Sequence, residues 1–264
     1  GLAKLTPTAP SPVITQLEAI LARQVAEQDA MSLLSEDIES HGKLALTFSQ
    51  ELGWGITARE VIDVDERITS LRSPGKLTLG EIRAATDAID NGLLNPKALK
   101  ILYDVIQVDE NRYLLPTPSV GFLLNHSCDP NVALLTVEDE FEFKAIRKIA
   151  AGEEVRWNYA TTMGDWFTMQ CKCGSSTCCG IVAGPLSLSC IAREEMLKQF
   201  GEELLLPHIA RWLRTGDCPS HLTGERYLRD FEGEAAMKKR ILLKHPRLHP
   251  EVHKRVRAAL SELA

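Results

Sequence analysis

The sequence predicts an α+β fold, in which a β-rich centre is flanked and interrupted by helices. Short apolar runs bounded by turns occupy the centre, at residues 44–71 and 113–159. Toward both ends, apolar residues recur at three- and four-residue spacing, which is typical of amphipathic helices. With 264 residues, the chain is long enough for one large domain with appendages.

The composition excludes several classes of protein. Hydrophobic residues make up 44% and charged residues 25%, the balance of an ordinary globular protein. The formal net charge of −6 argues against charge-driven binding of nucleic acid, so we expect no direct nucleic-acid partner. No apolar run approaches the roughly 18 residues of a membrane span, and no charged-then-apolar leader opens the sequence. We therefore expect no membrane contact and a reducing location, the cytoplasm or the nucleus.

Three helices are expected before residue 113, one ahead of the β-rich centre and two that interrupt it. A first amphipathic helix is predicted over residues 12–39. Thr78 and Glu81 have the spacing of a capping box, which predicts a helix that ends near residues 91–92. The Asn-Pro pair at residues 95–96 predicts the start of another helix that runs to about Tyr103.

Strands and further helices follow from the same patterns. Residues 44–48 and 56–58 are predicted as short strands on either side of a Gly-Trp-Gly string, and residues 132–136 and 141–145 as a hairpin. After Gly180 the pattern becomes helical, with segments near 188–200, 202–214, 222–242 and 250–262. The run from 237 to 257 is rich in Lys and Arg, which predicts a solvated helix face or a docking surface for an acidic partner.

The seven cysteines are unevenly placed and favour a metal site. Four of them crowd into nine positions, and an odd count with a tight cluster argues against a disulfide framework. Cys171, Cys173 and Cys178 supply three thiolates, whereas structural zinc takes four ligands in a tetrahedron. Cys128 is the natural fourth ligand, and Cys179 is its rival. The remaining two, Cys190 and Cys218, are expected to be helix-packing thiols.

Three short strings precede the cysteine run in a fixed order: Gly-Trp-Gly at residues 53–55, NHSCDPN at 125–131 and GEEVRWNY at 152–159. Together they resemble the SET-domain lysine methyltransferases, and the cysteine run resembles their post-SET zinc motif. The resemblance implies a β-clip-like, pseudoknotted core that uses S-adenosylmethionine, with zinc held by Cys128 and the three later cysteines. It also implies four parts: a helical segment at 1–42, a SET domain at 43–169 with a helical insert at about 75–105, a post-SET zinc motif at 170–182, and a helical extension at 183–264.

The resemblance assigns roles to individual residues. The cofactor would be bound by a set drawn from all three strings: Gly53, Trp54, Gly55, Asn125, His126 and Tyr159. Glycines at 53 and 55 allow close backbone approach, and the Asn125 amide can hold the amino-acid end of the cofactor. Tyr159 would orient the amine, because a phenol with a pKa of about 10 is a poor base at neutral pH. Trp54 either packs or touches the cofactor.

Two further aromatic residues are predicted at the catalytic site. Tyr113 is a second active-site tyrosine by position, in a stretch that matches the family poorly. Trp157 stands two residues before Tyr159, where family members usually carry Phe or Tyr, and its size predicts that mostly one methyl group is transferred. The substrate is expected to be a protein lysine. The alternatives are a small-molecule amine on the same scaffold and a non-catalytic protein-binding module.

Overall fold

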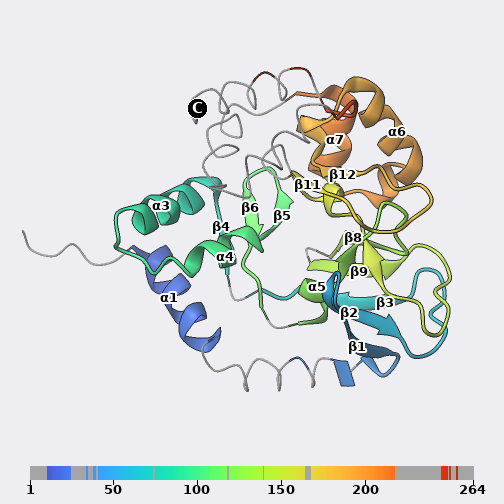
Figure 1. The fold of residues 1–264 in the computed structure, drawn as a ribbon, viewed down its shortest axis with the longest axis horizontal. Helices are drawn as coiled ribbons and strands as arrows, with labels where there is room; N and C mark the ends of the chain where they lie inside the picture. Colours follow the sequence, from blue (N-terminus) through green and yellow to red (C-terminus); the bar gives the residue numbers. More distant parts are fainter. Residues whose placement is uncertain are drawn as a thin grey trace, which may run out of the picture.

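Small sheets form the centre of the molecule, and helices lie on two opposite sides of them (Figure 1). The structure is a computed structural model that describes residues 11–24, 34, 38–39, 41–73, 75–117, 119–138, 140–163, 168–217, 245–248, 250 and 254. The α-helices are α1 (Pro12–Gln24), α3 (Leu79–Asp90), α4 (Ala98–Tyr103), α5 (Val120–Leu123), α6 (Cys190–Phe200) and α7 (Pro207–Thr215), and the 3-10 helices are η1 (Tyr159–Thr161), η2 (Pro185–Ser187) and η3 (Glu202–Leu204).

The strands are short, and most of them pair in antiparallel fashion. In chain order they are β1 (Leu44–Ser49), β2 (Gly53–Ala58), β3 (Arg67–Ser70), β4 (Lys76–Leu77), β5 (Ile106–Asp109), β6 (Arg112–Leu114), β7 (Asn125–His126), β8 (Val132–Val137), β9 (Glu140–Ala145), β10 (Arg156–Trp157), β11 (Thr168–Gln170) and β12 (Ile181–Ala183). The sheets have the orders β1-β2, β3-β9-β8, β4-β6-β5 and β11-β12. The exception is β7, which pairs with β10 in parallel.

The helical insert is built on a local signal that the sequence carries. Thr78 Oγ1 accepts a hydrogen bond from the Glu81 N–H at 3.2 Å, and the Glu81 carboxylate accepts from the Thr78 N–H at 2.7 Å. This capping box begins α3, whose buried face includes Ile82 and Ala85. Helices α1, α3 and α4 pack against one another on one side of the molecule (Figure 1).

Helices α6 and α7 cover the opposite side and are tied to the centre by polar contacts (Figure 1). Gln199 of α6 donates to the Cys128 carbonyl at 2.7 Å. His208 of α7 bonds the Thr162 carbonyl at 3.1 Å, and Arg211 forms an ion pair with Glu110 of the β5–β6 turn. The C-terminal helices therefore contact both the β5–β6 turn and the segment that follows Tyr159.

The predicted α+β class is confirmed, and several boundaries differ from the predictions. Helix α1 ends at Gln24, and most of the remainder of its predicted span lies outside the described residues. The Gly-Trp-Gly string lies inside β2 rather than between strands, because the ladder with β1 continues through it to the Gly53–Ser49 pair. The single helix expected over 202–214 is instead η3 followed by α7, since Pro207 opens a new helix at a first-turn position.

Other predictions fall on parts of the chain that the structure does not describe. These are the helix at 222–242, most of the helix at 250–262 and of the basic run at 237–257, and the thiol of Cys218. Within the described ranges, no helix is both long and apolar enough to cross a bilayer.

Candidate active site and metal centre

The three strings that are separate in the sequence meet at one place, which we call the motif junction: residues 53–55, 125–131 and 153–159. Strand β7 runs parallel to β10, with Asn125 opposite Arg156 and His126 opposite Trp157. The Val155 N–H donates to the Ile56 carbonyl at 2.8 Å, which brings β2 alongside the same segment. The junction is thus made by backbone hydrogen bonds between distant segments.

Asn131 fixes the junction from inside. Its side chain is buried, with 2% exposure, and makes three hydrogen bonds. The amide donates to the Glu154 carbonyl at 2.8 Å and to the Glu153 carboxylate at 3.0 Å, while its oxygen accepts from the Arg156 N–H at 2.8 Å. A buried carboxamide that is satisfied in this way specifies one arrangement of the two strings.

The Asn125 amide group lies between β2 and the GEEVRWNY string. Its Nδ2 donates to the Trp54 carbonyl at 3.2 Å and to Glu154 Oε1 at 2.8 Å. A Cβ at Gly55 would lie 2.7 Å from both Asn125 Nδ2 and Glu154 Oε1, so these side chains already require glycine there. Among the described residues none donates to Asn125 Oδ1, which leaves an acceptor that suits a ligand ammonium group.

The other two residues of the Gly-Trp-Gly string have different surroundings. Gly53 has a φ of +77°, a left-handed conformation that favours glycine. Trp54 is 49% exposed and meets Phe48 of β1 edge to face, with ring centroids 5.1 Å apart. The indole of Trp54 therefore packs against its cross-strand neighbour and keeps half of its surface open to solvent.

His126 links the junction to the cysteines. Its Nδ1 accepts a hydrogen bond from the Tyr159 N–H at 3.2 Å, so the ring proton belongs on Nε2. Nε2 lies 3.5 Å from Cys128 Sγ, where an N–H can donate to sulfur. Burial, with the Arg156 guanidinium as a second cause, lowers the pKa of His126 to about 4, so the ring is neutral.

Tyr159 and Trp157 share one acceptor. The Tyr159 hydroxyl donates to the Leu124 carbonyl at 3.0 Å, and Trp157 Nε1 donates to the same oxygen at 3.1 Å. The two rings lie 5.1 Å apart, and Trp157 also packs edge to face on Phe143. Burial raises the pKa of Tyr159, and the carboxylates of Asp104 and Glu154 add to the effect. The phenol therefore remains protonated.

Tyr113 occupies a different part of the molecule. It lies on β6, in the sheet with β4 and β5, and its side chain has 0% exposure. The structure thus brings Tyr159, Trp157 and His126 together, and it places Tyr113 in the sheet of the insert region.

The cysteine cluster consists of Cys128, Cys171, Cys173 and Cys178, whose sulfur atoms all lie within 4.8 Å of one another. Tetrahedral zinc with bonds of about 2.3 Å requires sulfur atoms roughly 3.8 Å apart, and the Cys128–Cys171 separation is 3.6 Å. The Cys128 N–H donates to Cys173 Sγ at 3.5 Å, a contact that stabilises a thiolate. The donor set fits zinc.

Cys179, the rival ligand, stands outside this cluster. Its own N–H donates to Cys128 Sγ at 3.4 Å, and its thiol donates to the Thr177 carbonyl at 3.8 Å. It therefore supports a member of the cluster through its backbone. Cys190, the first residue of α6, is exposed and contacts Glu194.

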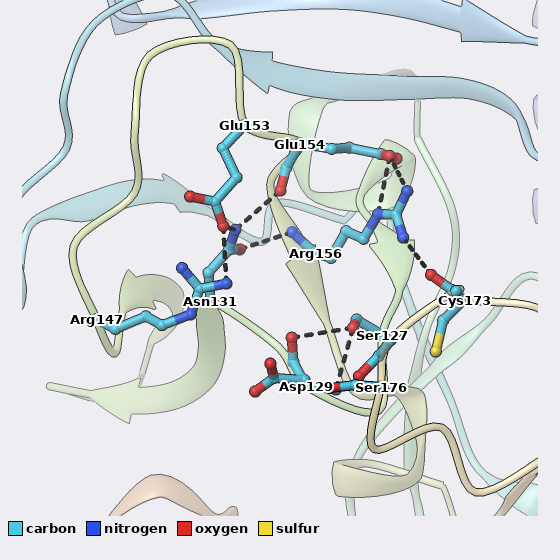
Figure 2. Close-up of a pocket in the computed structure, with 11 residues that line it drawn as sticks. Ser127, Asp129, Asn131, Arg147, Glu153, Glu154, Arg156, Cys173 and Ser176 are labelled. Atoms are coloured by element: carbon cyan, nitrogen blue, oxygen red, sulfur yellow. Dashed lines mark hydrogen bonds and ion pairs between the residues drawn. The ribbon is translucent and has the colours of Figure 1, made fainter.

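A polar cleft of about 350 Å³ lies beside the junction and was not predicted from the sequence (Figure 2). Figure 2 shows Arg147, Asn131, Glu153, Glu154 and Arg156 on one side of it and Ser127, Asp129, Cys173 and Ser176 on the other. None of the six predicted cofactor residues lines this cleft. The signal for Glu154 and Arg156 lay in the GEEVRWNY string, in which only the residues near Tyr159 had been given roles.

Comparisons with known proteins address the same region. The family model for the SET domain matches residues 53–160, which contain all three strings of the motif junction. A histone-lysine N-methyltransferase of Oryza sativa subsp. japonica, TRX1, is 25% identical over 167 residues, which is 60% of this chain. The matched part spans only 16% of the length of that relative.

Proposed function

Because this chain carries a SET domain, we propose that it is an S-adenosylmethionine-dependent methyltransferase that modifies lysine side chains of a protein. The observation that carries the proposal is the position of a partly buried, neutral Tyr159 at the motif junction, where its N–H donates to His126 Nδ1 and its hydroxyl donates to the carbonyl of Leu124, the residue before Asn125. The named relative, a histone-lysine N-methyltransferase, supports a protein substrate over a small molecule.

The cofactor is assigned to the residues predicted for it. Asn125 Oδ1 would accept a hydrogen bond from the ammonium group of the bound cofactor, while Gly53, Trp54 and Gly55 would line the approach along β2. The backbone beside His126 would contact the cofactor. His126 Nδ1 would hold the Tyr159 segment in place by accepting from the Tyr159 N–H. S-adenosylmethionine supplies an electrophilic methyl group on a sulfonium centre.

The chemistry needs little covalent participation from the protein. The lysine amine must lose its proton to solvent before it attacks, and a dry, apolar channel promotes this by lowering its pKa. Tyr159 remains protonated and would orient the amine, because its raised pKa rules out a role as base at neutral pH. Trp157 would form one wall of the channel. Positioning and desolvation account for catalysis by these residues.

We also assign zinc to Cys128, Cys171, Cys173 and Cys178, as a structural ion that holds the segment 170–182 against the NHSCDPN loop. The catalytic part would be residues 43–169 with its insert at about 75–105. Residues 1–42, which include α1, and 183–264, which include α6 and α7, would be additions to it. The proposed substrates are proteins of the nucleus or cytoplasm.

The test is transfer of labelled methyl groups to proteins in a cell extract, followed by mass spectrometry. The wild type is expected to label lysine residues, and Tyr159→Phe is expected to label them about a hundredfold more slowly. Label on a small molecule alone would instead support a small-molecule substrate. No label from zinc-loaded wild type, in extract or on peptides, would favour a binding module.

A further inference from the structure

We propose that Glu154 and Arg156 are positioning residues that connect the cysteine cluster to the cofactor-binding turn, so that zinc occupancy sets cofactor affinity through their side chains. This inference rests on the proposed function. It concerns a connection separate from the backbone, which also joins His126 to Cys128 through a single intervening residue.

The connection is a continuous series of hydrogen bonds, of which Figure 2 shows the part from Cys173 through Arg156 to Glu154. On one side, Arg156 Nη1 donates to the Cys173 carbonyl at 2.8 Å. In the middle, Arg156 grips Glu154 Oε2 with two nitrogen atoms: Nε at 2.8 Å and Nη2 in a short contact. On the far side, Glu154 Oε1 accepts from Asn125 Nδ2 at 2.8 Å, and the same amide reaches the Trp54 carbonyl.

The central ion pair, between Arg156 and Glu154, is better shielded from water than a typical surface pair. Arg156 and Glu154 side chains are 24% and 23% exposed, whereas the ion pair Lys100–Asp104 is 82% and 48% exposed. Exposed pairs contribute little because water screens them and their side chains lose entropy. Two guanidinium nitrogens donate to the one oxygen Oε2, which leaves Oε1 of the same carboxylate to accept from Asn125.

One end of the hydrogen-bond series acts on the cysteine loop, and the other end acts on the Asn125 amide. At the cysteine end, Arg156 holds the carbonyl of a proposed zinc ligand, Cys173, so it fixes the loop that carries residues 171–178. At the cofactor end, Glu154 occupies the donor side of the Asn125 amide and thereby turns Oδ1 outward. The absence of a Cβ at Gly55 gives this contact its room.

Zinc binding should therefore strengthen cofactor binding through these side chains. With zinc bound, Cys173 is fixed, and Arg156 can donate both to the Cys173 carbonyl and to Glu154 Oε2. Without zinc, the loop loses its main constraint, Arg156 loses a fixed acceptor, and Glu154 and Asn125 gain freedom that cofactor binding must remove. By reciprocity, bound cofactor should slow the loss of zinc.

Arg156→Ala is a practical test because the side chains of Arg156 and Glu154 line the polar cleft. The substitution therefore enlarges an open space and leaves no buried void. Arg147→Ala is the matched control. Arg147 lines the same cleft and pairs with Glu153, outside the series. Arg156→Lys keeps the charge but not the two-nitrogen grip.

Two quantities are measured on the full chain: the rate of zinc release to a chelator, and the calorimetric affinity for S-adenosylhomocysteine with and without zinc. Arg156→Ala is expected to release zinc about tenfold faster and to bind the ligand about tenfold more weakly, as expected for loss of a hydrogen bond to a charged group. Arg156→Lys should fall in between, and Arg147→Ala should match the wild type.

The outcomes separate this proposal from the proposed function. Zinc release from Arg156→Ala at the wild-type rate would overturn the proposed connection, whatever the affinity for S-adenosylhomocysteine. Equal ligand affinity in Arg156→Ala and wild type, both zinc-loaded, would overturn it as well. If zinc-loaded wild type binds no S-adenosylhomocysteine, the proposed function fails, while zinc release still tests the contact between Arg156 and the cysteine loop.

Discussion

The motif junction and the C-terminal helices both bury polar groups, but they do so by different means. In the junction, Asn131 and Asn125 satisfy backbone and side-chain groups from segments far apart in the chain. In α7, His208 is one polar group on a face that buries Ile209, Trp212 and Leu213. The junction thus depends on directional contacts, whereas the helices depend mainly on apolar area. Substitutions should harm ligand binding in the first region and only stability in the second.

The largest difference between the two regions should come from their cysteines. Cys128→Ser is expected to remove the zinc, which we predict at about one ion per chain, and to weaken cofactor binding as well. Cys190→Ser, on the exposed start of α6, should leave both unchanged. Elemental analysis of protein purified without chelator checks the metal, and zinc-free wild type would refute the assignment.

Asn131→Ala tests the directional contacts of the junction alone. It leaves the partly buried Arg156 N–H and Glu154 carbonyl without their partner, so we expect a loss of about 2 kcal/mol in the free energy of unfolding. Asn91→Ala, an exposed carboxamide after α3, should cost less than about 1 kcal/mol. Urea denaturation measures the free energy of unfolding of both variants. Equal losses would show that the junction hydrogen bonds stabilise the fold no more than an exposed one does.

Several elements of the fold and the site were predictable because their signals are local in the sequence. The capping box of Thr78 and Glu81 lies within one helical turn, and its spacing alone predicted the start of α3. The hairpin of β8 and β9 was predictable for the same reason. Cysteine chemistry predicted the cluster, because few uses other than zinc explain such spacing.

The parts that were missed depend on contacts between distant segments. Nothing in the local pattern of residues 125–126 indicates a parallel pairing with residues 156–157. Likewise, the approach of Gln199 to the Cys128 carbonyl joins residues 71 positions apart. Arg156 was overlooked because a charged residue two positions after Glu154 is usually solvated, and only the folded chain brings the Cys173 carbonyl within reach of its side chain.

A pH titration probes the helical region. Burial lowers the pKa of His208 to about 4, against an ordinary value of 6.5, despite the opposing carboxylates of Asp109 and Glu110. The unfolded chain therefore binds the proton more readily, so stability is complete above about pH 6.5 and falls as the pH drops toward 4. Wild type should lose about 2–3 kcal/mol more than His208→Gln over this window, measured by urea denaturation at each pH.

Identical pH profiles for wild type and His208→Gln would contradict a buried, neutral histidine in α7. Methyl transfer at neutral pH should be nearly unchanged in this variant, because His208 contacts the Thr162 carbonyl and not the junction itself.

The smallest expected effect is a change in product within the junction. Trp157 lies 5.1 Å from the Tyr159 ring and is the largest side chain available at its position. We expect wild type to transfer mostly one methyl group and Trp157→Phe to raise the ratio of di- to monomethyl product about tenfold. Cofactor affinity should change little. Trimethyl product from wild type, seen by mass spectrometry of the best substrate, would show that Trp157 does not limit the channel.

The central claim, that the motif junction binds the methyl donor, is tested most directly by calorimetric titration with S-adenosylhomocysteine. Zinc-loaded wild type should bind it in the micromolar range. Asn125→Ala should bind at least about tenfold more weakly, because Oδ1 and its orientation by Glu154 are both lost. The control is Asn95→Ala, in the insert, where the wild-type Asn95 side chain accepts from the Lys97 N–H. This variant should bind like wild type. An affinity of Asn125→Ala equal to that of wild type would contradict the claim.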